Sequence, residues 1–217
     1  MTDYAARRDR MIERDIVGRG IKDAGVVEAM RRVPREEFVP ATRRRAAYDD
    51  APLPIGHGQT ISQPYIVALM LEALELDDDG RSEAALDVGT GSGYAAAILS
   101  LLVDSVYSIE RHVELVRQAA ERFERLGYDN IEVRHGDGTR GWPEHAPFTA
   151  ILVSAAAPVV PPALKEQLAV GGRLVVPVAD STFGQRLLRV TRLADDQFEQ
   201  DTLTAVRFVP LVSDEGG

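Results

Sequence analysis

The stretch "LDVGTGSGYAAAIL", residues 86–99, indicates the fold class of the whole chain. It opens with a short apolar run, passes through glycines at positions 89, 91 and 93, and continues as an alanine-rich run that favours a helix. A strand followed by a glycine-rich turn and a helix is the first unit of a doubly wound α/β sheet. Because such a turn lets a ligand approach the main chain closely, we expect a ligand site there.

Strand-like and helical patterns alternate on the C-terminal side of this stretch. The apolar, often β-branched runs are residues 83–88, 104–109, 130–134, 148–153 and 172–178. The helical patterns between them are residues 92–102, 112–127 and 161–169. This alternation predicts right-handed βαβ units and a parallel sheet that is covered on both faces.

The end of the sequence departs from the alternation. Apolar runs at residues 186–193 and 202–212 are separated by a polar, acidic turn without a helical pattern. They predict an antiparallel hairpin that completes the sheet. The expected fold is therefore α/β, with a doubly wound, mostly parallel, seven-stranded Rossmann-like sheet and a C-terminal antiparallel hairpin.

The N-terminal part carries a different pattern. Residues 3–47 are predicted to be helical, residues 48–63 to form a loop, and a buried helix to begin near Pro64, since proline is favoured in the first turn of a helix. We expect residues 1–63 to form N-terminal helices and a loop that pack on a core of residues 64–217, as one compact domain.

Composition limits the classes of partner. The chain has 217 residues, a net charge of −9 and no cysteine. Nucleic-acid affinity comes largely from Lys and Arg, so the acidic balance weakens that interpretation. Without cysteine there is no disulfide, thiolate metal site or cysteine nucleophile, and no apolar run approaches the roughly 20 residues of a membrane span. We expect a cytoplasmic protein with no nucleic-acid, membrane or metal partner.

The glycine spacing and two acidic residues indicate which ligand the turn binds. A dinucleotide motif needs its third glycine where this chain has Tyr94, and the Gly-Lys-Ser/Thr of a phosphate loop is absent. Glu110 ends the second strand-like run, where an acid can accept hydrogen bonds from ribose hydroxyls. Asp137, in "HGDGT" after the third run, can accept from an adenine amino group.

Together these features predict an adenosine without phosphates, namely S-adenosylmethionine. The competing interpretation is that the glycines form only a tight turn and that the two acids are only solvated strand ends. It requires three coincidences at consecutive strand ends, so the cofactor interpretation is favoured.

Residues 154–158, "SAAAP", bear on the methyl acceptor. This segment follows the fourth parallel strand, where enzymes that methylate planar amino groups commonly carry a polar motif. An apolar segment cannot orient an amine, so N-methylation is disfavoured. A carboxylate is already ionised at neutral pH, because its pKa is near 4. It needs holding in line at near-attack distance and no general base.

The segment "IGHGQTISQP", residues 55–64, supplies neutral groups suited to hold a carboxylate. Gln59, Thr60 and Ser62 are neutral donors, and the two glycines free the main chain. A structural role is favoured over a catalytic one for His57, the only titratable residue of the segment. Ser62 has a competing interpretation as the cap of the helix that begins near Pro64.

The chain resembles protein-L-isoaspartate (D-aspartate) O-methyltransferases. The resemblance is carried by residues 10–40, 47–70, 86–99, 106–111, 126–164, 171–178 and 206–212. "GHGQTISQP" is highly specific to that family, whereas many methyltransferases share the G-x-G-x-G turn. The resemblance implies a class I S-adenosylmethionine-dependent methyltransferase fold. It also implies methyl transfer to the free α-carboxylate of L-isoaspartyl residues in damaged proteins, with D-aspartyl residues as a further candidate acceptor. S-Adenosylhomocysteine is the product, and the ester collapses to a succinimide, which begins repair.

The resemblance also implies roles for individual residues. Ser62 corresponds to the family's active-site serine. The implied cofactor-binding residues are Asp87, Gly89, Thr90, Gly91, Ser92, Gly93, Glu110, Arg111, Asp137 and Gly138. The implied substrate-binding residues are His57, Gln59, Thr60, Ile61, Gln63, Val206, Arg207 and Val209. The last strand, through Val206 to Pro210, would hold an extended peptide by main-chain pairing, which needs no sequence code.

The sequence departs from the family pattern at two places, and it leaves two other functions as alternatives. The turn within residues 75–88 is longer and more acidic than usual, and Ala179 stands where glycine is common. A methyltransferase acting on RNA or a small molecule is one alternative function. A non-catalytic S-adenosylmethionine-binding module that docks proteins is the other. For the main interpretation we expect a monomer whose partners are damaged proteins and peptides.

Overall fold

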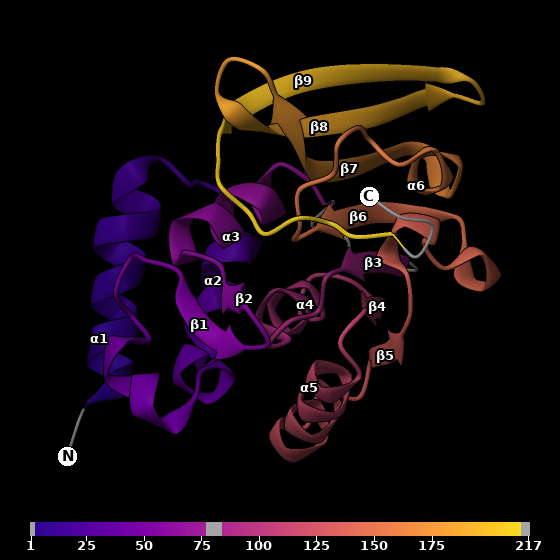
Figure 1. Ribbon diagram of the computed structural model, residues 1–217. Coiled ribbons are helices and arrows are strands. Elements are labelled where there is room, and N and C mark those ends of the chain that lie inside the picture. The colour runs from indigo at the N-terminus through magenta and orange to yellow at the C-terminus, as the bar shows by residue number, and fades with distance from the viewer. Residues whose placement is uncertain (1–2, 77–83, 214–217) are drawn as a thin grey trace.

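A computed structural model describes residues 3–76 and 84–213, and its main element is a twisted sheet (Figure 1). In the described part of the chain, seven strands form this sheet in the order β5-β4-β3-β6-β7-β8-β9. They are β3 (Ala84–Val88), β4 (Ser105–Glu110), β5 (Ile131–His135), β6 (Phe148–Val153), β7 (Leu168–Asp180), β8 (Gly184–Ala194) and β9 (Gln197–Ala205). Strands β3 to β7 pair in parallel, and β8 and β9 add antiparallel pairs. The predicted sheet is confirmed.

Helices connect the parallel strands as the alternating pattern predicts. These are α4 (Tyr94–Leu99) after β3, α5 (Val113–Leu126) after β4, and α6 (Pro162–Glu166) after β6, with short 3₁₀ helices at Gly138–Arg140 and Pro143–His145. The sheet separates two apolar clusters: Ala85 belongs to one and Leu86 to the other. Successive side chains of a strand point to opposite faces, so the apolar run of β3 is buried on both sides.

The N-terminal segment is helical, as expected, and Figure 1 shows it gathered at one side of the sheet. It comprises α1 (Tyr4–Met11), a π-helical turn (Ile12–Ile16), α2 (Ala24–Arg32) and 3₁₀ helices at Val17–Arg19, Arg35–Phe38 and Ala41–Ala46. Asp3 and Asp23 cap α1 and α2 by accepting hydrogen bonds from Ala6 N and Val26 N. Met30 and Phe38 share one apolar cluster with the core, which supports our proposal that residues 1–63 and 64–217 form a single domain.

Residues 48–63 are not a plain loop, so that prediction is wrong in part. They contain a hairpin of β1 (Leu53–Gly56) and β2 (Gln59–Ile61), and α3 (Pro64–Glu72) follows it. Leu53 and Ile55 are buried while the residues after them are exposed, which is the alternation of a half-buried strand. His57 and Gly58 connect the strands, and both have positive φ, as tight hairpin turns require.

The last strand also differs from its prediction, because β9 ends at Ala205. The chain then leaves the sheet edge and returns across β6 and β3 (Figure 1). Ala156 N donates to Val209 O at 2.8 Å, and Leu211 N donates to Ala156 O at 2.7 Å. Pro210 lacks an N–H group and cannot continue a regular ladder, so this segment covers the carboxyl ends of the strands instead.

Two sequence expectations meet the limits of the described residues. Most of the acidic turn before β3 falls in residues 77–83 and lies outside them. Within residues 3–76 and 84–213, no helix combines the length and the apolar character needed to cross a membrane.

Gly93 is expected to be much less tolerant of alanine than Gly127. Both have positive φ, but an added Cβ at Gly93 would lie 2.6 Å from Phe123 Cζ, whereas at Gly127 it would meet nothing within 4 Å. Gly127→Ala should lower the free energy of unfolding by about 1–2 kcal/mol through left-handed strain alone. Gly93→Ala should lose about 1–3 kcal/mol more through overpacking, as measured by urea denaturation. Equal losses would show that the Phe123 ring moves aside freely.

Candidate active site

The carboxyl ends of β3, β4 and β6 converge on a cavity of about 260 Å³. Ligands of doubly wound sheets bind at this edge, where the strand order reverses between β3 and β6. The cavity is lined by the glycine turn after β3, the end of β4, strand β2 and residues 209–212. The site predicted from the glycine spacing is therefore a cavity bounded by segments far apart in the sequence.

Glu110 holds the glycine turn against the end of β4. Its side chain is buried, and its two carboxylate oxygens accept hydrogen bonds from Gly91 N and His112 N, each at 2.9 Å. Gly89 N and Thr90 N both donate to Ile109 O, which fixes the start of the turn. A carboxylate offers about four acceptor positions, so Glu110 keeps acceptor capacity for a ligand in the cavity that it lines.

Asp87 supports the turn from beneath the cavity. Ser108 Oγ donates to Asp87 Oδ2 at 2.6 Å and lies 2.5 Å from Thr90 Oγ1, so a buried chain of polar groups runs under the turn. Asp87 Oδ1 has no partner among the described residues. Burial raises the pKa of Asp87 to about 7; the Ser108 hydrogen bond lowers it and the charge of Glu110 raises it further.

Asp137 and Gly138 behave differently although they are adjacent. Asp137 Oδ1 accepts hydrogen bonds from Thr139 N at 2.9 Å and Thr139 Oγ1 at 2.7 Å, so this carboxylate caps its own turn. Gly138 lines the cavity, and an added Cβ there would lie 2.4 Å from Val88 Cγ1. Only glycine allows the main chain to approach the end of β3 this closely.

A second cavity, of about 430 Å³, lies beside the first. It is lined by Pro52, Thr60, Ser62, Gln63, Ile66, Ser154 and residues 205–209. Thr60, Ser62, Ser154 and Val209 line both cavities. These four residues therefore stand where the two cavities adjoin, and we call them the junction.

The structure brings most of the predicted site residues to these cavities. The first cavity is lined by Gln59, Thr60, Ile61, Ser62, Gly89, Thr90, Gly91, Ser92, Glu110, Arg111, Gly138 and Val209. The second adds Gln63, Val206 and Arg207. Asp87, Gly93 and Asp137 are not among the residues that line either cavity, and His57 is at the exposed hairpin tip, with its ring centroid 5.7 Å from that of His112. The structural role of His57 stays a prediction.

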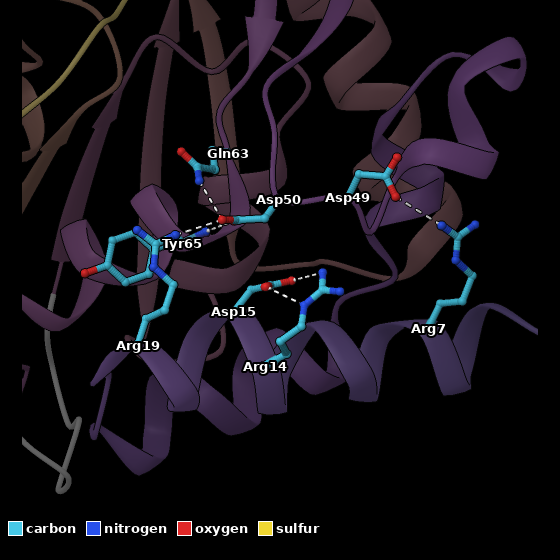
Figure 2. Close-up of polar contacts among 8 residues, drawn as sticks. All are labelled: Arg7, Arg14, Asp15, Arg19, Asp49, Asp50, Gln63 and Tyr65. Atoms are coloured by element: carbon cyan, nitrogen blue, oxygen red, sulfur yellow. Dashed lines mark hydrogen bonds and ion pairs between the residues drawn. The ribbon is translucent and has the colours of Figure 1, made fainter.

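Ser62 does not cap α3, so that competing interpretation is wrong. The N-cap of α3 is Gln63, whose own side chain makes no capping hydrogen bond. Figure 2 shows why Gln63 is fixed: its Nε2 donates to Asp50 Oδ2 at 2.6 Å, and Tyr65 N donates to Asp50 Oδ1 at 3.3 Å. Asp50 is in turn paired with Arg19 at 2.8 Å, and the Arg19 guanidinium lies over the Tyr65 ring.

Ser154 is a residue of the site that the sequence interpretation missed. It stands first in the otherwise apolar segment "SAAAP", yet it lines both cavities. Ser154 N donates to Val88 O at 2.8 Å, so the residue is fixed to the end of β3. Its place directly after a parallel strand was the available signal, because ligands bind at the carboxyl edge of such sheets.

Comparison with known protein families gives a match over nearly the whole chain. A family model described as "Protein-L-isoaspartate(D-aspartate) O-methyltransferase (PCMT)" matches residues 6–216. The chain is 59% identical over 210 residues to "Protein-L-isoaspartate O-methyltransferase 2" of Pelobacter propionicus, covering 97% of this chain and 92% of that protein. It is 53% identical over 215 residues to "Protein-L-isoaspartate O-methyltransferase 1" of Rhodopseudomonas palustris, covering 99% and 86%.

Solved structures agree with the sequence comparison. One named protein-L-isoaspartate O-methyltransferase has a TM-score of 0.84 and 29% identity, and covers 96% of this chain and 67% of that chain. A Plasmodium falciparum structure of a protein with the same name, in complex with S-adenosyl-L-homocysteine, has a TM-score of 0.82 and 28% identity, and covers 98% and 99%. The likeness therefore includes the N-terminal helices as well as the sheet.

Asp87 is expected to make stability depend on pH. Its pKa is about 7 in the folded chain against an ordinary 3.8, so the folded state holds a proton that the unfolded state releases. This contribution is complete below about pH 4 and is lost as pH rises through about 7. Asp87→Asn removes the titration. Urea denaturation from pH 4 to 8 should show the wild type losing stability relative to the variant up to about pH 7 and not beyond. Parallel pH profiles would contradict this assignment.

Proposed function

Because the chain belongs to the protein-L-isoaspartate(D-aspartate) O-methyltransferase family, we infer that it methylates the free α-carboxylate of L-isoaspartyl residues in proteins and peptides. It uses S-adenosylmethionine and releases S-adenosylhomocysteine. The methyl ester that forms can close to a succinimide, which reopens in part to normal aspartate. The enzyme thus begins the repair of damaged proteins.

The observation that carries this function is the junction of the two cavities. A methyl transfer between two ligands needs a site for each and an opening where the reacting atoms meet in line. Thr60, Ser62, Ser154 and Val209 line both cavities, and we propose that this opening lies among them. The first cavity would hold the cofactor, and the second would hold the peptide.

The polar groups of the first cavity fit an adenosine without phosphates. Glu110 is a buried acceptor suited to ribose hydroxyls, and Gly138, packed closely on Val88, presents only main chain to the cavity, where a flat ring can lie against it. We propose that the turn at 89–93 approaches the methionine part, that Arg111 completes the rim, and that Asp87 and Asp137 shape these segments from behind. When bound, S-adenosylmethionine supplies an electrophilic methyl group.

Ser62 is proposed to hold the acceptor carboxylate. That carboxylate is already an anion at neutral pH, so no base is needed. A neutral hydroxyl can donate one hydrogen bond to it and orient it without an ion pair that would stabilise the ground state more than the transition state. Thr60 and Ser154 stand beside Ser62 at the same junction, and Gln59 and Ile61 complete this wall of the cofactor cavity.

The peptide main chain is proposed to lie along residues 205–209. Val206 N donates to the main-chain oxygen of Gln185, and Phe208 N donates to its side-chain Oε1. Main-chain groups alternate sides along an extended segment, so Arg207 presents its own N–H and C=O to the opposite side. Pairing to main-chain groups is independent of side chains, which suits an enzyme that meets damage in any sequence.

The setting in which the enzyme works is also a proposal. We propose that it acts in the cytoplasm as a monomer, without nucleic-acid or membrane partners. A net charge of −9 and the absence of cysteine support this proposal. Light scattering coupled to size exclusion would test the oligomeric state.

Methylation of matched peptides tests the function. An L-isoaspartyl peptide should be labelled by S-adenosylmethionine carrying a radioactive methyl group, and its aspartyl twin should not. Both have a carboxylate, so only the branched main chain distinguishes them at the junction. A D-aspartyl peptide and an RNA sample complete the series. Equal labelling of both aspartate isomers, or of neither, would reject the proposal, and counts in RNA would favour the alternative enzyme.

Ser62 and Glu110 should have opposite effects on binding and turnover. Ser62→Ala should lower turnover at least tenfold and leave the affinity for S-adenosylhomocysteine nearly unchanged. Glu110→Gln should weaken that affinity by about 1–3 kcal/mol, the scale of hydrogen bonds to a charged group. Calorimetry measures the affinity, and the peptide assay measures turnover. A parallel loss of both quantities in Ser62→Ala would show that Ser62 is a structural residue.

A further inference from the structure

Arg35 is a buried cation that the mechanism above does not use. It lies in the proline-bracketed segment "VPREEFVP", residues 33–40, and its side chain is 0% exposed. Its contacts are with neutral groups. Nε donates to Ala47 O at 2.8 Å, Nη2 donates to Ser62 O at 2.7 Å, and the guanidinium carbon is 4.7 Å from the centroid of the Tyr94 ring.

These contacts are costly as a means of stabilising the fold. No salt bridge joins Arg35 to a residue that the structure describes, and its Nη1 has no hydrogen-bond partner there. Burial lowers the pKa of Arg35, because the charged guanidinium is removed from water. An apolar side chain of similar volume is often as stable as a buried charge or more so. Stability alone therefore gives a weak reason for arginine at this position.

The three contacts of Arg35 connect the two sides of the junction. We call residues 59–62 the acceptor wall, and the glycine turn at 89–93 with Tyr94 the cofactor wall. Ser62 directly follows β2, the second strand of the hairpin at residues 53–61, and Ala47 precedes this hairpin in sequence. Tyr94 is the first residue of α4, directly after the glycine turn, and it lines the cofactor cavity. Arg35 itself is not among the described residues that line either cavity. One rigid guanidinium thus spans the acceptor wall and the cofactor wall from behind.

We propose that Arg35 is a positioning residue, which fixes the main chain of Ser62 relative to the cofactor turn so that the acceptor carboxylate lies in line for methyl transfer. This proposal rests on the proposed role of Ser62. In-line transfer is sensitive to small displacements, and a planar group with several fixed donors positions two carbonyls better than a flexible ammonium can. Because Arg35 lines neither cavity, its guanidinium is not placed to form an ion pair with the acceptor itself.

Arg8, in α1, provides a matched control. Its Nε donates to Tyr48 Oη at 2.8 Å and its Nη1 to Arg31 O at 2.8 Å, and it pairs with Glu36 at 3.5 Å. Like Arg35, it is largely buried and holds a main-chain carbonyl. Its hydrogen bonds and ion pair are all within the N-terminal segment, so its loss should affect stability and not alignment.

The test compares Arg35→Lys, Arg35→Met and Arg8→Lys. Lysine cannot span both carbonyls, and methionine removes the buried charge, so the two Arg35 variants should differ in thermal stability. Both should nevertheless lower kcat for the isoaspartyl peptide at least tenfold with both substrates saturating. Their Kd for S-adenosylhomocysteine, measured by calorimetry on the folded protein, should stay within threefold of the wild type. Arg8→Lys should lose stability and keep kcat within twofold.

The outcomes separate this proposal from the proposed function. A wild-type enzyme that does not label the isoaspartyl peptide would reject the function. An active wild type with unchanged kcat in either Arg35 variant would reject the positioning role alone. Loss of folding in both Arg35 variants would also overturn it, because Arg35 would then be a residue that the fold requires.

Discussion

The cofactor half of the site depends on the Glu110 carboxylate and the two main-chain N–H groups that it accepts from. Gly91 N belongs to the turn after β3, and His112 N follows the end of β4, so one side chain joins neighbouring strand ends. A buried carboxylate is costly unless hydrogen bonds satisfy it, and those bonds also give the turn a single shape. Asp87 lies on the neighbouring strand β3, where burial and the charge of Glu110 both favour its protonated form. The cavity is therefore fixed before any ligand arrives, and the cost of ordering the turn does not fall on binding.

The acceptor half is built differently, from the short hairpin of β1 and β2 and from the C-terminal residues 205–209. Strand β2 has only three residues, and an isolated hairpin of that size is not stable in water. Packing and polar ties supply what pairing does not: Ile61 is buried in the core cluster, Asp50 fixes Gln63, and Arg35 holds the carbonyl of Ser62. The N-terminal helices therefore do more than cover the sheet, because Arg35 lies on one of them and Arg19, which pairs with Asp50, lies on another.

The sheet and the cofactor turn could be predicted because their signals are local. Strand and helix periodicity lie within single segments, and the glycines directly follow a strand. The hairpin at 53–61 was missed because two very short strands around Gly-His-Gly look like a loop. Asp137 was correctly placed at a strand end, but its bonds to Thr139 direct it to its own turn. Arg35 gave no signal at all, since an arginine in a charged segment looks solvated. Its burial depends on Ser62, 27 residues away, and on the tertiary position of Tyr94.

The distribution of charge follows from the chemistry of the reaction. A sulfonium donor and a carboxylate acceptor lose their opposite charges as the methyl group transfers, so a strong ion pair with either one would stabilise the reactants more than the transition state. The residues that line both cavities agree with this requirement. The two cavities share three hydroxyl-bearing residues and one apolar residue: Thr60 on β2, Ser62 directly after β2, Ser154 directly after β6, and Val209. None of these four shared residues is charged, and the buried Arg35 reaches this place only through its hydrogen bond to the Ser62 carbonyl. In the function proposed above, rigid, buried groups set the alignment, and the reacting atoms meet among neutral ones.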